Sequence, residues 1–175
     1  MTWKQSAAAI LIAAAAAAAH AQTGAPPSVQ WTLQVLRDGQ QIDSFDATTS
    51  VGQAHTDTHH HVIAHDVGCL QHPGGNIDLS RTLTVSPTQA TDADVTLAIE
   101  AQETFEDEAP QQSPEGCRLP PQPRQVSASH PGLRVPAGQW ATWTIVDKNP
   151  SLVYRVHAGI APQSPQSPLS PSSAR

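Results

Sequence analysis

Residues 29–49 read VQWTLQVLRDGQQIDSFDATT, and this stretch decides the fold class. In its first half, Val, Trp, Leu and Val alternate with polar residues, which is the period of a β-strand with one buried face. Asp38-Gly39 follows, and this pair suits the positive φ angles of a type I′ hairpin turn. A returning strand is expected through Ile42 and Phe45 to about Thr49. The folded part of the chain is therefore predicted to begin with a β-hairpin.

Similar alternation recurs along the chain and predicts further short strands. The expected segments are 58–67, 81–85, 95–104, 125–129, 132–135, 140–146 and 152–160. The segments between them, 51–54, 71–78, 87–94 and 106–124, are rich in turn formers and predict loops. In 140–146 both faces carry apolar side chains, which predicts a strand inside a sheet and not at its rim. About eight strands at this spacing predict an all-β protein, an antiparallel β-sandwich of Ig-like or related Greek-key topology.

The first 21 residues have the pattern of a cleaved signal peptide. Lys4 gives the positive start, residues 7–18 form an apolar run, and Ala19-His20-Ala21 is a small-x-small cleavage site. An apolar run of this length is too short to span a bilayer of ~30 Å at about 1.5 Å per residue. We therefore expect a periplasmic or secreted protein without a membrane span after cleavage.

Four segments follow from these patterns. The signal peptide 1–21 precedes an irregular lead-in at 22–28, which holds Pro26 and Pro27. The β-sandwich domain is expected to occupy 29–160. Residues 161–175, APQSPQSPLSPSSAR, predict a disordered Pro/Ser-rich tail, because each proline removes a backbone donor.

The charge of the chain argues against a nucleic-acid partner. It holds 9 Lys and Arg against 15 Asp and Glu, a net charge of −6 with neutral histidines. Binding to a phosphate backbone depends on clustered Lys and Arg, and the sequence has no basic run.

Cys69 and Cys117, the two cysteines of the chain, are predicted to form a disulfide bond. In an oxidising compartment an even cysteine count usually indicates pairing. A reactive or metal-bound thiol is the alternative, but neither cysteine belongs to a Cys-x-x-Cys motif.

A cluster of histidines is the most unusual feature of the sequence. His55, His59, His61 and His65 are candidate ligands for Zn²⁺ or Cu²⁺, since imidazole binds both ions well. On a strand, His59 and His61 would point the same way with Cα atoms about 6.6 Å apart. The alternatives are a polar row on the wet face of a strand and a pH-sensing role.

Signals of catalysis are weak. The sequence lacks a Gly-x-Ser-x-Gly elbow. Acidic residues gather at the end of the strand predicted at 95–104, and we interpret them as a solvated surface. These residues are Glu100, Glu103, Glu106, Asp107 and Glu108.

These observations favour an exported, non-enzymatic β-domain that acts as a binding or accessory module in the bacterial cell envelope. Its expected partner is an envelope protein, held by exposed edges or loops as in β-strand addition. The alternative is a periplasmic Zn- or Cu-binding protein that uses the His-rich strand. A hydrolase is a third class.

Overall fold

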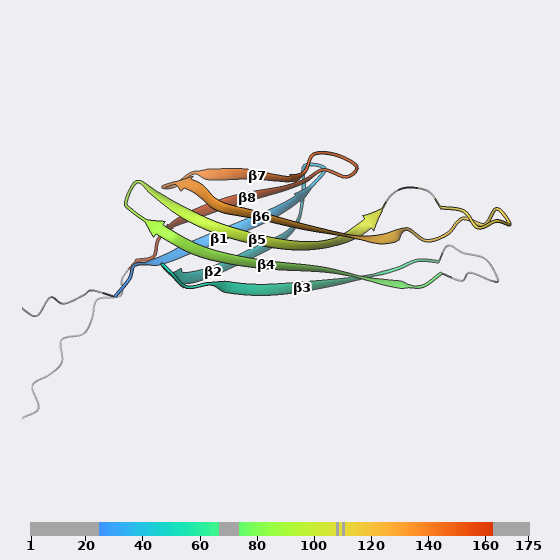
Figure 1. The fold of residues 1–175 in the computed structure, drawn as a ribbon, viewed down its shortest axis with the longest axis horizontal. Coiled ribbons are helices and arrows are strands. Elements are labelled where there is room, and N and C mark those ends of the chain that lie inside the picture. The colour runs from blue at the N-terminus through green and yellow to red at the C-terminus, as the bar shows by residue number, and fades with distance from the viewer. Residues whose placement is uncertain (1–24, 67–73, 108, 110, 163–175) are drawn as a thin grey trace, which may run out of the picture.

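The computed structural model describes residues 25–66, 74–107, 109 and 111–162, and these residues form two antiparallel sheets of four strands each (Figure 1). No helix occurs among them, and so none that is long and apolar enough to cross a membrane. The strands are β1 (Ser28–Arg37), β2 (Gln40–Ser50), β3 (His55–Ala64), β4 (Asn76–Ala90), β5 (Asp94–Asp107), β6 (Gln122–Pro136), β7 (Trp140–Val146) and β8 (Leu152–Ile160).

Within each sheet, strands that are consecutive in the chain pair with each other, and the chain passes between the sheets after β2 and again after β6. Sheet A has the order β2-β1-β8-β7 and sheet B the order β3-β4-β5-β6. The all-β class and the expected number of strands are confirmed, and the two sheets are consistent with a β-sandwich. An Ig-like or Greek-key topology is not confirmed, because the one pairing between distant strands joins β1 to β8, the first and the last.

The core consists of the inward rows of both sheets. Alternate residues of β1, β5 and β8 are almost fully buried, as the sequence pattern predicts for strands with one dry face. Phe45 of β2 adds an aromatic ring, whereas β3 and β7 contribute no side chain to the fully buried set. The largest buried side chains include Trp31, Tyr154, Phe45, Leu33, Leu83, Leu97 and Ile99.

The hairpin predicted at 29–49 is confirmed. Asp38 and Gly39 have φ angles of 50° and 81°, as the expected turn requires. The indole nitrogen of Trp31 donates a hydrogen bond of 3.1 Å to Thr49 Oγ1. The turn is also tied to the start of β8, because Asp38 Oδ1 accepts a 2.9 Å hydrogen bond from the Ser151 amide.

Two predicted strands are longer than the sequence pattern indicated, because prolines sit at β-bulges inside them. The prediction that 87–94 is a turn region is wrong, since β4 continues to Ala90 with a shift of register after Pro87. The segments 125–129 and 132–135 belong to one strand, β6, with a bulge at Pro131-Gly132. A bulge disrupts the hydrogen-bond ladder locally, and it is therefore one of the positions at which a sheet accepts a proline.

Two further predictions need correction. Strand β7 lies at the edge of sheet A, not inside the sheet, and Trp140 is 39% exposed. The His-rich strand spans His55–Ala64 instead of 58–67. The predicted signal segment 1–21 lies outside the described residues, as does the predicted tail from residue 163 onward.

Sheet B extends beyond sheet A at one end of the molecule (Figure 1). β4, β5 and β6 have 14 or 15 residues, whereas the strands of sheet A have 7 to 11. At this end, sheet A stops at the β1–β2 turn and the β7–β8 loop, which lie over the inner face of sheet B. The inner face of sheet B is therefore covered along only part of its length.

The core assignment predicts the effect of truncating Leu33. Leu33→Ala should lower the free energy of unfolding by about 2–5 kcal/mol, because Leu33 is fully buried and leaves a cavity. Gln30→Ala, on the exposed face of the same strand, should change it by less than about 0.5 kcal/mol. Urea denaturation followed by tryptophan fluorescence measures both, and equal losses would contradict the assignment of the two faces of β1.

Candidate functional site

The most distinctive feature of the interior is a polar layer at the end of the hydrophobic core. In sheet B, the cross-strand row after Leu83 and Ala101 consists of His59, Arg81 and Glu103. In sheet A, the row of Asp43, Val35 and Tyr154 provides the polar partners. The two sheets therefore meet at this level through charged and hydroxyl groups. In the hydrophobic core they meet through apolar side chains.

Arg81 joins two carboxylates on different sheets. Its Nε donates to both carboxylate oxygens of Glu103, at 2.7 and 2.8 Å. Its Nη1 donates to Asp43 Oδ2 at 2.6 Å. Since Glu103 lies on β5 and Asp43 on β2, the guanidinium bridges the two sheets.

Glu103 is the most deeply buried charged group of the described residues, with a side chain that is 1% exposed. Besides Arg81, its Oε1 accepts a short hydrogen bond from the Tyr154 hydroxyl. Burial raises the pKa of Glu103, and the Arg81 guanidinium offsets only part of that rise. Burial, followed by the neighbouring Glu103 carboxylate, raises the pKa of Tyr154 far above its ordinary value, so the phenol stays a donor.

Asp43 and His59 complete the network at its solvent side. Burial raises the pKa of Asp43, but hydrogen bonds from His59 and Arg81 outweigh it and hold the pKa below its usual value. His59 Nδ1 lies 2.9 Å from Asp43 Oδ1. The imidazole also stacks on Phe45, with ring centroids 4.1 Å apart, so its orientation is fixed from two sides.

A cleft of about 540 Å³ adjoins this network where sheet A ends over sheet B. Asp43, His59, Arg81 and Glu103 lie on its polar side. Its apolar walls come from both sheets and from the β7–β8 loop: Ile42, Ile63, Leu79, Phe105, Pro150 and Leu152. The remaining lining residues are polar: Arg37, His60, His61, Ser80 and Thr104. The volume is within the range of small-ligand sites, roughly 300–1,000 Å³.

The structure does not bring the four predicted metal ligands together. His55 packs edge-on against Trp31, with ring centroids 5.8 Å apart, and His59 bonds to Asp43. His61 lines the cleft, and His65 contacts Glu106. Among the described residues, no group of three or more His, Cys, Asp or Glu side chains is arranged to hold a metal ion.

The predicted Cys69–Cys117 disulfide is not confirmed. Cys69 belongs to 67–73, outside the described residues. Cys117 is half-buried in the β5–β6 loop, where its amide lies 3.3 Å from Ser113 Oγ and its carbonyl accepts a hydrogen bond from the Ser113 amide.

The interpretation of the acidic residues as solvated surface is wrong for Glu103. The sequence does carry a signal, because Glu103 continues the inward alternation of Val95, Leu97, Ile99 and Ala101. Arg81 continues that of Leu83 and Val85 in the same way. A charged residue at a position where the alternation predicts a buried side chain indicates a polar contact in the interior. Its partners on the other sheet cannot be predicted from the spacing.

Comparison with known proteins gives no further information about the site. No protein-family model matches the chain, and neither a curated protein nor a solved structure matches it. The function has to be argued from the geometry of the cleft and the network.

The buried network predicts a pH-dependent cost of removing Arg81. Arg81→Met leaves Glu103 without its cation, so the free energy of unfolding should fall by about 3–5 kcal/mol at about pH 8. At about pH 5 the loss should be smaller, because a carboxyl with a raised folded-state pKa keeps its proton better in the folded chain than in the unfolded one. The stability that the protonated Glu103 carboxyl confers decreases as the pH rises.

A double substitution provides the control. Adding Glu103→Gln to Arg81→Met removes the buried charge, and it should restore part of the stability at about pH 8 and remove most of the difference between the two pH values. Urea denaturation at both pH values measures these effects. An Arg81→Met loss that is independent of pH would contradict the assignment of a charged, buried Glu103.

Proposed function

We propose that the protein is an exported, non-enzymatic β-domain that acts as a binding or accessory module of the bacterial cell envelope, and that the cleft is its binding site. The cleft carries this proposal. It combines apolar walls with a few fixed polar groups, which is the usual composition of a ligand site. The signal-like segment 1–21 supports export to the periplasm or the medium, and the segment 161–175 would serve as a spacer.

The hydrogen bonding of the acidic groups supports binding over catalysis. Both carboxylate oxygens of Glu103 accept hydrogen bonds from Arg81, and Oε1 also accepts one from Tyr154. Both oxygens of Asp43 are engaged as well, by Arg81 and His59. A carboxylate with a side-chain partner on each oxygen has no unengaged oxygen to take a proton from a substrate, which supports binding over general-base chemistry.

The alternative of a Zn- or Cu-binding protein has less support. It requires several histidines around one point, whereas His55, His59 and His65 contact Trp31, Asp43 and Glu106 respectively. The proposed partner is therefore a macromolecule or organic ligand of the envelope and not a metal ion.

Site-specific photo-crosslinking tests the binding site. We expect a photoreactive phenylalanine analogue in place of Ile42, which is 47% exposed at the cleft, to form a discrete adduct with a component of the envelope fraction of the producing cells. The matched control is the same analogue at Gln89, which is exposed near the far end of β4. Absence of an adduct from Ile42, or the same adducts from both positions, would refute the cleft as the binding site.

A disulfide between Cys69 and Cys117 remains part of the proposal. Because successive strands of sheet B are antiparallel, the β3–β4 and β5–β6 connections emerge at the same end of the sheet. A contact between His65, just after β3, and Glu106 of β5 supports this proximity.

Thiol titration of the unfolded, non-reduced protein checks this bridge. We expect no reactive thiol before reduction and two after it. Replacing both cysteines by serine should lower the free energy of unfolding by about 4 kcal/mol, because the bridge would close a loop of nearly 50 residues. Two reactive thiols without reduction would show that the bridge is absent.

A further inference from the structure

The edge strands of the two sheets differ in how they are protected against pairing with another chain. Strand β2 has a bulge at Ile42, and β7 has one at Ile145. Strand β6 has a bulge at Pro131-Gly132 and further prolines at both ends. Bulges and prolines are common means of preventing edge-to-edge association.

Strand β3 has none of these features. Its register with β4 is uninterrupted from His55 opposite Val85 to Ala64 opposite Asn76. Its sequence, HTDTHHHVIA, contains neither proline nor lysine. Of the four edges that the described residues form, β3 is therefore the one with a regular register along its whole length, and its one carboxylate side chain, Asp57, does not line the cleft.

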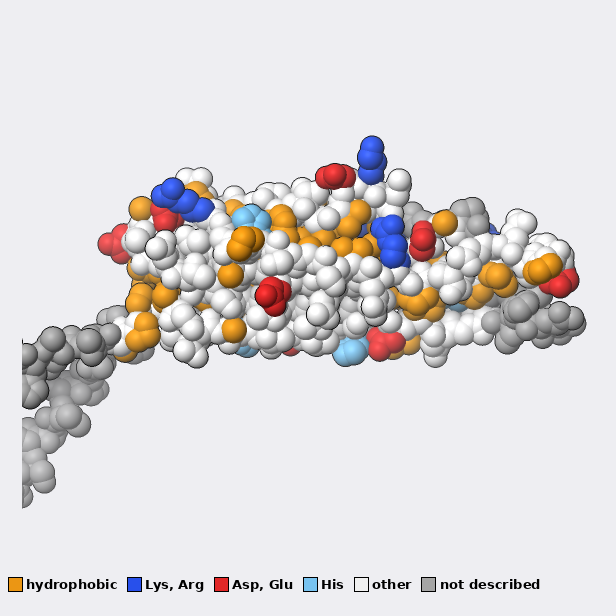
Figure 2. All heavy atoms as spheres, viewed as in Figure 1, with side chains coloured by type: hydrophobic (Ala, Val, Ile, Leu, Met, Phe, Trp, Pro, Cys, Tyr) orange, Lys and Arg blue, Asp and Glu red, His pale blue; other side chains and the backbone are white. Residues whose placement is uncertain are grey.

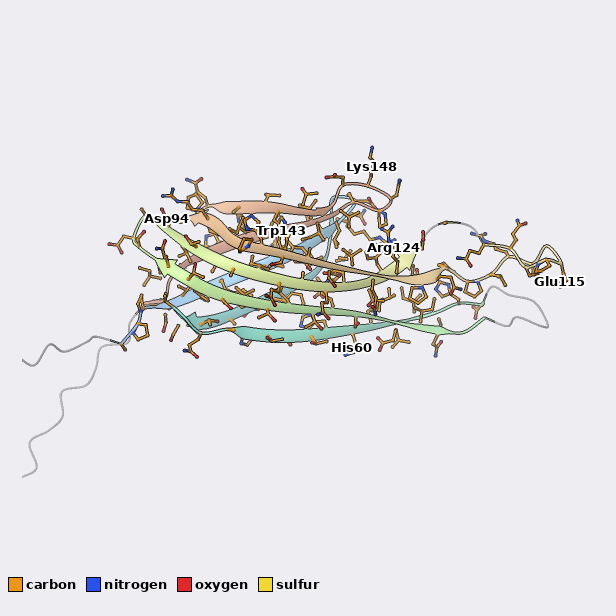
Figure 3. The ribbon with its side chains drawn as sticks, viewed as in Figure 1. His60, Asp94, Glu115, Arg124, Trp143 and Lys148 are labelled. Atoms are coloured by element: carbon orange, nitrogen blue, oxygen red, sulfur yellow. The ribbon has the colours of Figure 1, made fainter. Side chains whose placement is uncertain are left out.

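The two seams between the sheets also differ. At the β6–β7 seam, Trp143 packs against His130 with ring centroids 5.5 Å apart. Figure 2 shows hydrophobic side chains gathered over this seam, and Figure 3 places Trp143 between the two strands. At the β2–β3 seam, His59 contacts Asp43 and Phe45 of β2. Beyond this contact, Ile42 of β2 and Ile63 of β3 line the cleft.

The two faces of β3 offer different chemistry to an incoming strand. On the inward face, His61 and Ile63 adjoin the apolar cleft walls. On the outward face, Thr56 bonds to Thr84 at 2.8 Å and Thr58 to Thr82 at 2.9 Å, both exposed. Farther along this face are His60, which points away from the body of the protein in Figure 3, and Val62, which is 59% exposed.

We infer that β3 receives an extended peptide segment of a partner as an added strand beside the cleft. Apolar side chains at alternate positions of that segment would enter the cleft, since side chains of one face repeat at about 6.6–7 Å. Threonine or serine at the other positions would extend the hydroxyl pairs of β3 and β4. This inference rests on the proposed function and specifies the partner of the same site.

A second copy of this chain fits less well than such a peptide. Its β3 would present His55, Asp57, His59 and His61 on the inward face, opposite the apolar walls of the cleft. His55 and His59 are moreover already packed against Trp31 and Phe45 of their own sheet A.

Selection from a peptide library tests the inference with the full-length protein. Phage-displayed random peptides of roughly 12 residues are long enough to pair with all of β3. We expect the enriched peptides to alternate apolar residues with Thr or Ser and to lack proline. Hydrogen–deuterium exchange with a synthetic copy of the best peptide should then show protection of amides in β3.

Two variants and a control locate the site. His61→Lys should weaken binding of that peptide by roughly tenfold or more, because an inward-pointing charge at the cleft opposes strand addition. His61→Gln should retain binding within about threefold, and Gln89→Lys, far from the cleft, should leave it unchanged.

Three results would overturn the inference: no enriched peptide, an enriched peptide that protects another element, or a β3-dependent dimer in size-exclusion chromatography. Its failure can be told apart from failure of the proposed function. An adduct from Ile42 without peptide binding to β3 would keep the cleft as a binding site and reject strand addition. Absence of that adduct would reject the binding site itself.

Discussion

The contact between Arg81 and Glu103 is the constraint on which the rest of the structure depends. The two residues are cross-strand neighbours on the inner face of sheet B, and Arg81 also reaches Asp43 of sheet A. A buried carboxylate is costly unless it is paired and hydrogen-bonded, and Arg81 and Tyr154 together donate to both oxygens of Glu103. The network therefore places charged groups between the two sheets at this row and links the sheets there.

The cleft is a consequence of this arrangement and of unequal strand lengths. Sheet A ends just past the polar row, while β4 and β5 continue and carry Leu79 and Phe105 into a region that sheet A does not cover. Because His59 is held by Asp43 and by the Phe45 ring, the polar side of the cleft is ordered before any ligand arrives. Such preorganisation reduces the entropy lost on binding.

The edges of the sheets show a similar division of roles. Bulges at Ile42, Ile145 and Pro131-Gly132 interrupt three edge strands, whereas β3 is regular. Exposed regular edges favour unwanted association, and proteins usually avoid them. Retention of one such edge beside the cleft is consistent with the proposed use of β3 as a site of strand addition.

The all-β class, the first hairpin and the bounds of β7 and β8 could be predicted from the residues alone, because period-two alternation and turn residues are local properties. The sequence also indicated which faces of β1, β5 and β8 are buried. It did not determine that 87–90 and 130–131 continue strands, since a bulge depends on the partner strand, or that β7 is an edge. The candidate functional site, in contrast, depends on how the two sheets pack. Asp43, Arg81, Glu103 and Tyr154 are far apart in the chain, and the facing of two sheets, not any spacing in the sequence, brings their charges and hydroxyl group within hydrogen-bonding distance.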